Sequence, residues 1–304
     1  MWSTIISLIG THLLVPFFFL VTLGNKHRNK LTAIGWLILT LGYVGHIYFA
    51  GRWDWLGIYL RYALLAGLLL STVRSYRNNR TAPLLPERSW RAWGGIAFYG
   101  LMSVVFLGMA AASVAGRFHQ EEAVALQFPL KDGTYYVAHG GNIPIVNYHN
   151  EYLPQQFALD IVKMNVLGLR ANGLYPEDLR RYAIFGDRLY SPCSGVVRKA
   201  VDGYPDRAPS DFANGLPPGT PAAGNHVVIA CRGVDVYIAH IQQGTVQVQE
   251  GDAVDEGSWI GNVGNSGNTS EPHLHIHAEK DGAGVPITFN GRFLVRNSLV
   301  RSAE

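Results

Sequence analysis

Four apolar stretches occupy most of the first 115 residues, and they constrain the fold more than any other feature of the sequence. As a helix, each is long enough to cross the hydrocarbon core of a bilayer, which is about 30 Å thick. One such stretch is compatible with a buried helix of a water-soluble domain, but four in succession predict a multi-pass membrane anchor over residues 1–116. The expected spans are Trp2–Leu23, Thr32–Ala50, Trp55–Val73 and Trp93–Ala115.

Basic residues are concentrated in two of the three loops between these stretches. Lys26, Arg28 and Lys30 lie in the first loop, and five arginines from Arg74 to Arg91 lie in the third. The positive-inside rule places both loops in the cytoplasm, so both termini and everything after Gly116 are expected outside it. The net charge of +3 comes largely from these loops and is no argument for nucleic-acid binding.

After residue 116 the sequence is typical of short strands separated by turns, which predicts a mainly β domain over residues 117–304. Ala123–Leu130 and Thr134–Ala138, joined through Asp-Gly, predict a hairpin. Gln156–Val162 predicts a strand, and Pro176–Phe185 predicts a short helix that begins with proline.

Cys193 and Cys231 are the only cysteines, and both flank expected strands. A disulfide between them is feasible in a domain outside the cytoplasm. The sequence leaves the bonded and the free forms equally open. It does not indicate a thiolate zinc site, because the paired cysteine spacing of such sites is missing.

Three alternating histidines follow a glycine-rich loop within Gly261–Ala278. In a strand, this alternation sends His273, His275 and His277 to one face and the apolar residues between them to the other. Neutral imidazole is the commonest metal ligand and also transfers protons near neutral pH. The pattern therefore predicts a metal or proton-transfer site, with His277 exposed to solvent at the far end of the strand.

The segment Gly-Asn-Ser-Gly-Asn-Thr-Ser-Glu-Pro-His-Leu-His, which ends at His275, resembles the terminal motif of the lysostaphin and LytM type zinc endopeptidases. These enzymes cleave peptide cross-links in bacterial cell walls. Gly224–Ile229 and Tyr237–His240 resemble earlier segments of that family in the same order, and the resemblance covers residues 153–278. It implies an antiparallel β domain of the LytM type, a Zn²⁺ cofactor and peptidoglycan peptide as substrate. Together with the apolar spans and basic loops, it predicts a protein of the bacterial cytoplasmic membrane with this domain outside the cytoplasm.

The resemblance also implies roles for particular residues. In the family, zinc is held by a histidine, an aspartate four residues later and the second histidine of the final His-x-His. Asp160 and His275 match two of these ligands, and His240 and His273 match the histidines that handle protons or the developing oxyanion. Gln156 stands where the first ligand is expected, so the implied metal set is Gln156, Asp160 and His275.

This departure leaves three alternatives. Gln156 coordinates zinc directly or through water, or His149 replaces the missing ligand, or zinc is lost and the domain binds peptidoglycan or regulates a wall hydrolase. The other four matching residues are all present, which favours an active metallopeptidase. The sequence does not identify any regulatory membrane or envelope partner. A sensor function is disfavoured because the cytoplasmic loops are short.

Overall fold

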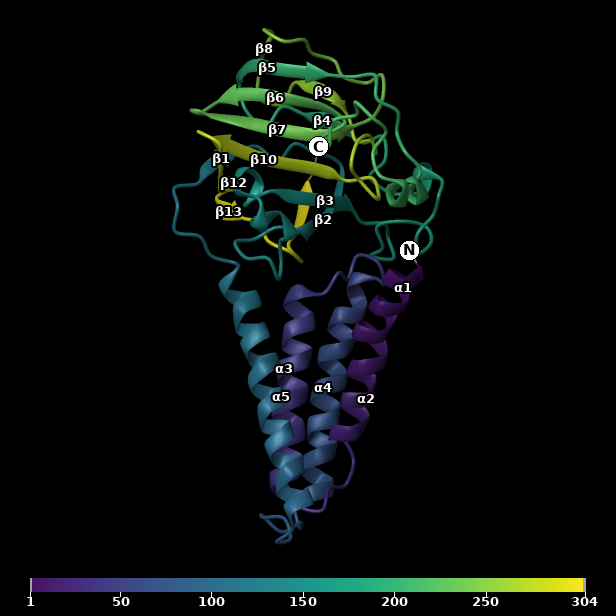
Figure 1. The fold of residues 1–304 in the computed structure, drawn as a ribbon, viewed down its shortest axis with the longest axis vertical. Helices are drawn as coiled ribbons and strands as arrows, with labels where there is room; N and C mark the ends of the chain where they lie inside the picture. The colour runs from purple at the N-terminus through teal and green to yellow at the C-terminus, as the bar shows by residue number, and fades with distance from the viewer. Residues whose placement is uncertain (1, 303–304) are drawn as a thin grey trace. The chain divides into compact units, whose positions relative to one another are not determined.

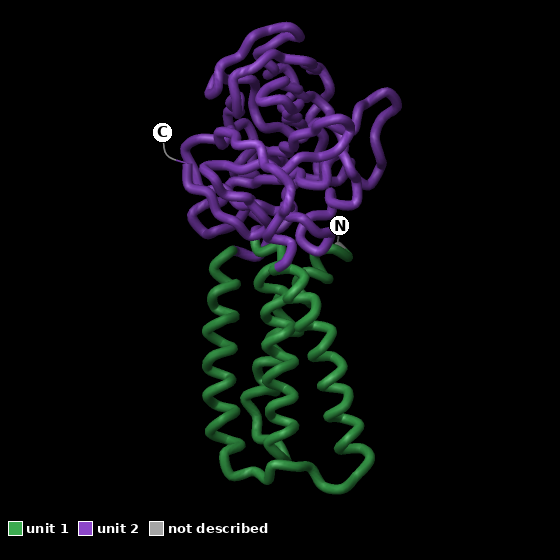
Figure 2. Tube along the Cα trace, turned by 90° about the vertical axis from the view of Figure 1, so that its left-hand side faces the viewer, with its two compact units in different colours: residues 1–53, 58–114 green, residues 54–57, 115–304 purple. Residues whose placement is uncertain are grey.

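The computed structural model describes residues 2–302, which form two compact units (Figures 1 and 2). The helical unit contains the chain up to Trp53 and Ile58–Val114. The β-rich unit contains Asp54–Gly57 and the chain from Ala115 onward. A short piece of the loop between two helices is therefore part of the β-rich unit.

The helical unit is built from long apolar helices. Among the described residues, three helical stretches are long and apolar enough to cross a membrane, namely Ser3–Leu23, Lys30–Ala50 and Trp90–Ala115. The remaining long helix is less apolar and carries Arg61, Arg74 and Arg77. The bounds are α1 (Trp2–Ile9), the π-helical η1 (Gly10–Leu14), α2 (Val15–Leu23), α3 (Lys30–Ala50), α4 (Ile58–Asn79) and α5 (Trp90–Ala115).

The expected start of the third span at Trp55 is wrong. α4 begins at Ile58, directly after Gly57. Gly57 has a φ of 101°, which glycine adopts readily and which a right-handed helix does not contain. Trp55 lies instead in the segment that packs within the β-rich unit.

The loops that follow α2 and α4 are each hydrogen-bonded to a helix end beside the other loop. Lys30 N donates to Pro83 O at 2.9 Å, and Asn79 Nδ2 donates to Asn25 O at 3.1 Å. The two basic loops therefore lie at the same end of the helical unit.

The β-rich unit confirms the expected mainly antiparallel domain. Its largest sheet has the strand order β14-β2-β3-β10-β7-β6-β5-β8, with β11 also paired to β10, and the smaller sheets are β1-β12-β13 and β4-β9. The bounds are β1 (Val124–Leu126), β2 (Gly133–His139), β3 (Leu159–Lys163), β4 (Arg188–Tyr190), β5 (Gly195–Val201), β6 (Asn225–Cys231), β7 (Val234–Ile241), β8 (Ala253–Val254), β9 (Trp259–Asn262), β10 (Leu274–Lys280), β11 (Ala283–Val285), β12 (Ile287–Phe289), β13 (Arg292–Phe293) and β14 (Leu299–Ser302). Short 3₁₀ helices are η2 (Tyr148–Glu151), η3 (Leu153–Gln155), η4 (Leu179–Arg181) and η5 (Pro209–Asn214).

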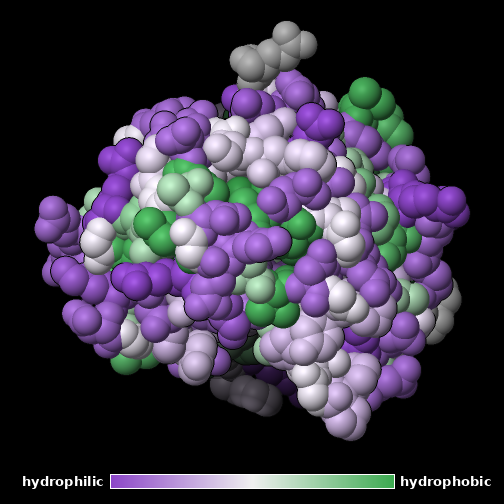
Figure 3. All heavy atoms as spheres, turned by 90° about the horizontal axis from the view of Figure 1, so that it is seen from above, coloured by the Kyte–Doolittle hydropathy of each residue, from purple (hydrophilic) through white to green (hydrophobic). Residues whose placement is uncertain are grey.

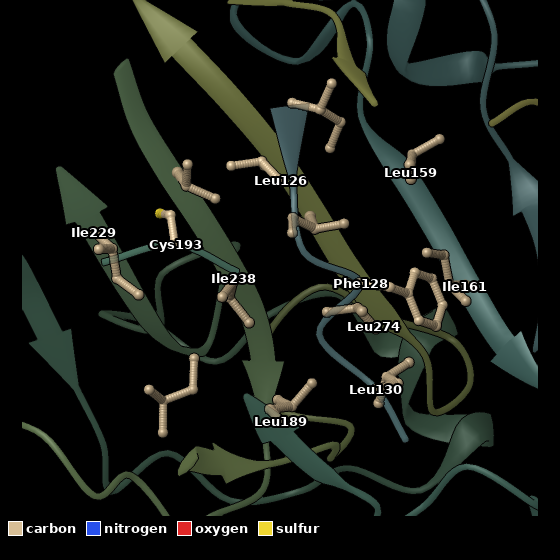
Figure 4. Packing of buried hydrophobic residues seen from close by; sticks show 14 of the residues in the cluster. Leu126, Phe128, Leu130, Leu159, Ile161, Leu189, Cys193, Ile229, Ile238 and Leu274 are labelled. Carbon is tan, nitrogen blue, oxygen red and sulfur yellow. The ribbon is translucent and has the colours of Figure 1, made fainter. Parts of the chain in front are cut away.

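One face of the large sheet is covered by the hydrophobic core of this unit (Figure 4). Ile161 of β3, Ile238 of β7 and Leu274 of β10 all point into it. Because side chains alternate along a strand, Asp160 and His275 project from the opposite face. Seen from above relative to Figure 1, the surface in Figure 3 is mostly hydrophilic, with small hydrophobic groups scattered over it.

The predicted hairpin over residues 123–138 is wrong. β1 pairs in parallel with β12, whereas β2 pairs with β3 and β14. Pro129 lies between β1 and β2 and cannot donate a ladder hydrogen bond, so the two strands are separated and join different sheets.

The predicted helix over residues 176–185 is also wrong. Only the single turn η4 forms there. Asn172 N donates to Arg181 O at 2.8 Å and Ala183 N donates to Arg170 O at 3.0 Å, so tertiary hydrogen bonds take groups that a helix would use internally.

The two cysteines form a disulfide. Cys193 precedes β5, Cys231 ends β6, and they are 38 residues apart in sequence. Both side chains belong to the hydrophobic core shown in Figure 4. Of the two forms that the sequence left open, the structure has the bonded one.

Candidate metal centre

Asp160 lies at the centre of a cluster of buried polar side chains. It pairs directly with His275 across β3 and β10, and the Asp160 Oδ1 to His275 Nδ1 distance is 3.0 Å. His149, from η2, places its Nε2 3.0 Å from both carboxylate oxygens. The hydroxyl of Tyr148 donates to Asp160 Oδ2 at 3.2 Å, and this tyrosine is 53% exposed. The cluster therefore reaches the surface beside Tyr148.

His240 joins this cluster through an irregularity in β7. The register between β6 and β7 shifts near this point, and His240 has a φ of 60°. A positive φ is rare for a residue other than glycine and interrupts the alternation of the strand. His240 thereby leaves the face occupied by Ile238, and its ring centroid lies 5.8 Å from that of His275.

His273 precedes β10 and lies between His240 and Asp160. Its ring centroid is 4.9 Å from that of His240, and its Nε2 is 3.4 Å from Asp160 Oδ1. The structure thus brings Asp160, His240, His273 and His275 together.

Backbone carbonyls orient the rings of His240 and His273. His240 Nδ1 lies 2.8 Å from Ser266 O, and His273 Nδ1 lies 2.8 Å from Glu271 O. A carbonyl only accepts, so each ring carries a proton on Nδ1. In the neutral form, Nε2 is then the acceptor nitrogen of each ring.

The electrostatic surroundings shift the pKa values of the residues in the cluster in different directions. Burial alone raises the pKa of Asp160, but His149 and His273 outweigh it and hold this pKa well below its usual range. Burial lowers the pKa of His240 well below its ordinary value and also lowers the pKa of His275. For His273, the Asp160 carboxylate outweighs the effect of burial and raises the pKa. At neutral pH, Asp160 is therefore ionised and His240 is neutral.

Gln156 has other partners. It follows η3 in a turn rather than lying on the strand predicted over residues 156–162, because β3 begins only at Leu159. Its Nε2 donates to Gly284 O at 3.1 Å. Gly284 pairs with Glu279, which is four positions along β10 from His275.

Two groups of side chains in the described residues have the composition and spacing to hold a metal ion. One is His149, Asp160 and His275, and the other is His240, His273 and His275. Within each group the ligand atoms lie within 4.8 Å of one another. The first group offers two imidazoles and one carboxylate, a donor set that suits zinc and leaves a coordination position open.

His277 is buried rather than exposed, contrary to the expectation from its place on the strand. It is 4% exposed and stacks on Tyr237, with the ring planes 8° apart. Its Nδ1 lies 3.0 Å from His275 Nε2. His275 therefore has Asp160 at one ring nitrogen and His277 at the other, and the contact with His277 restricts the orientation of the His275 ring.

For a zinc ion held by His149, Asp160 and His275, replacement of His277 by alanine is expected to weaken binding by about 10- to 100-fold, the usual cost of losing a partner that orients a metal ligand. Competition with a chromophoric chelator would measure the affinity. His226→Ala is the matched control, because His226 on β6 is also buried but places its Nδ1 against Gly224 O. Equal affinity in the two variants would contradict the role assigned to His277.

Comparison with known families agrees with this geometry. Residues 182–287 match the model of peptidase family M23. The chain therefore carries an M23 peptidase domain, which confirms the resemblance to lysostaphin and LytM enzymes. The matched range includes His240, His273 and His275, whereas His149 and Asp160 precede it.

Several solved structures are similar to this chain. A peptidase M23 from Pseudomonas aeruginosa is 17% identical, with 59% of this chain and 56% of that one covered and a TM-score of 0.32. A zinc-containing peptidase from Vibrio cholerae is 20% identical, with coverages of 54% and 39% and a TM-score of 0.30. The catalytic domain of lysostaphin from Staphylococcus simulans is 20% identical, with coverages of 36% and 80% and a TM-score of 0.23. The chain thus spans less than two thirds of the first two structures, and no curated protein matches it.

Proposed function

We propose that this protein is a membrane-anchored zinc endopeptidase that hydrolyses peptide bonds in bacterial peptidoglycan. One observation carries the proposal: in the β-rich unit two imidazoles lie 3.0 Å from a buried carboxylate with two further histidines beside them, and three of these four histidines fall within the M23 match. Domains of this family are typically zinc-dependent and act on peptidoglycan.

His149, Asp160 and His275 are the proposed zinc ligands. His149 supplies the imidazole that Gln156 does not, and its contacts with both oxygens of Asp160 support this choice. When bound, zinc supplies Lewis-acid chemistry for peptide hydrolysis. The second histidine group is the less favoured ligand set, because it does not include Asp160, the carboxylate that the family resemblance assigns to the metal.

His240 and His273 are the proposed catalytic residues. The neutral ring of His240 offers Nε2 as a proton acceptor. His273 has a raised pKa, so it more readily donates a hydrogen bond from Nε2 to negative charge that develops on a substrate oxygen. The exposed Tyr148 lies where a peptide would approach Asp160.

The proposed location is the bacterial cytoplasmic membrane, with four spans and the M23 domain outside the cytoplasm. The disulfide between Cys193 and Cys231 supports an oxidising compartment. The basic loops after α2 and α4 lie at one end of the helical unit, as expected if α4 is a fourth span and both loops face the cytoplasm.

An alkaline phosphatase fusion after Glu304 is expected to be active, because that enzyme needs an oxidising compartment to form its disulfides. A matched fusion in the loop after α4, at Pro83, should be inactive. The reverse pattern would overturn the proposed orientation.

The enzymatic proposal is tested with the full-length protein in detergent. We expect about one zinc per chain and new peptide amino termini when it is incubated with purified peptidoglycan, both removed by a chelator and restored by zinc. Stoichiometric zinc without new termini would exclude hydrolysis of that substrate. Absence of both, together with binding to peptidoglycan, would assign the domain to the binding or regulatory class.

A further inference from the structure

Arg170 is buried beside two carboxylates close to the metal centre. Its Nε donates to Glu271 Oε2 and lies 3.9 Å from Asp54 Oδ2. Its Nη2 donates to Leu174 O at 2.8 Å. Asp54, Arg170 and Glu271 are 0%, 1% and 6% exposed, so water screens these charges little. A buried guanidinium in such surroundings has few alternative positions and fixes the groups that it contacts.

Glu271 connects Arg170 to His273. Its side chain accepts from Arg170, and its backbone carbonyl accepts from His273 Nδ1 at 2.8 Å. The same carbonyl accepts from Thr269 Oγ1 at 2.8 Å. The position of Glu271 therefore determines where the acceptor for the His273 ring lies, and with it the ring orientation and tautomer.

A second set of contacts holds the same segment. Tyr175 donates from its hydroxyl to Ser270 O at 2.9 Å, directly before Glu271 in the chain. The ring of Tyr175 stacks on Trp55, with centroids 5.6 Å apart and planes 17° apart. Arg170 Cζ lies 3.7 Å from the centroid of the same Trp55 ring. Trp55 thus contacts both residues that hold Ser270 and Glu271.

Asp54 and Trp55 come from the loop between α3 and α4, although they belong to the β-rich unit. Asp54 O also accepts from Arg170 N at 3.1 Å. We propose that Arg170 is a positioning residue for His273, and that Asp54 and Trp55 from this inter-helix loop complete its support. The inference rests on the proposed role of His273, and it makes the loop a structural part of the catalytic domain.

The test is the tautomer of His273 in the full-length protein at a pH where its ring is neutral, read from the ring ¹⁵N shifts of histidine-labelled samples and assigned with His273→Gln. We expect wild type to show His273 protonated at Nδ1. Arg170→Met and Asp54→Asn should give a mixture of tautomers, and Arg170→Lys an intermediate one. Asp187→Asn is the control, because Asp187 is a partly buried carboxylate paired with Lys163 at 2.9 Å. An unchanged tautomer in the folded variants would overturn the proposal, whether or not the protein cleaves peptidoglycan.

Kinetics separates positioning from folding. We expect Arg170→Met to lower kcat by about 10- to 100-fold, as a small misplacement of a reacting group does, with zinc content and KM unchanged. If Arg170→Met fails to fold, the isosteric variant Asp54→Asn provides the same test, with a smaller expected decrease in kcat. If wild type is active and the variants are equally active, the positioning role of Arg170 is refuted and the proposed function is not. Inactive wild type would refute the proposed function. The tautomer measurement would still test the positioning role of Arg170.

Discussion

Replacement of His149 by alanine is expected to abolish stoichiometric zinc binding in the full-length protein, and peptidoglycan hydrolysis with it. His149 Nε2 is 3.0 Å from both oxygens of Asp160. Because a direct donor is removed, the loss of zinc affinity should exceed the roughly 100-fold that the loss of an orienting partner causes. Metal content after dialysis and a chelator competition would measure it.

Gln156→Ala is the matched control, because Gln156 stands at the position that family spacing assigns to the first ligand. Its side chain is hydrogen-bonded to Gly284, so this variant should keep its zinc. Gln156→His combined with His149→Ala should not restore binding, because residue 156 lies in the turn before β3. Loss of zinc in Gln156→Ala with retention in His149→Ala would return the ligand role to Gln156.

The part of the site on β10 could be predicted from sequence because a regular strand obeys a simple rule. Leu274 and Ile276 enter the core, so His275 must project from the other face. The same rule places Asp160 between two core residues of β3. Antiparallel pairing then brings Asp160 opposite His275, a contact that no local pattern in the sequence shows.

The remaining residues depend on irregular backbone, which periodicity does not describe. His240 reaches the cluster through a positive φ, and alternation alone would have sent it to the face of Ile238. His149 lies eleven positions before Asp160, on a 3₁₀ turn whose path is set by tertiary hydrogen bonds such as Asn147 Nδ2 to Ala158 O at 3.2 Å. Spacing therefore pointed to Gln156, whereas the fold of the loop favours His149.

The burial of His277 and the contacts of Arg170 were beyond sequence reasoning for a related reason. Both depend on neighbours that are distant in the chain, Tyr237 for the histidine and Asp54 for the arginine. One feature of the sequence is consistent with the second contact. Asp54 is a single acidic residue in a short loop between apolar helices, and such a residue needs a partner when it is buried.

His273→Ala and His240→Ala are each expected to lower kcat by about 10²- to 10⁴-fold, the usual contribution of a positioned proton-transfer or hydrogen-bonding group. Neither residue belongs to the proposed ligand set, so both variants should retain one zinc per chain. Release of peptide amino termini from purified peptidoglycan, at several substrate concentrations, would give kcat and KM separately.

A zinc titration distinguishes these catalytic variants from the ligand variants. Activity lost through weakened zinc binding, as in His277→Ala, should return when zinc is raised above the new dissociation constant. The activity of His273→Ala should stay low at every zinc concentration, because His273 does not belong to the proposed ligand set of His149, Asp160 and His275. If excess zinc restores His273→Ala, then His273 is a ligand, and the group of His240, His273 and His275 would have to replace the set proposed for the metal.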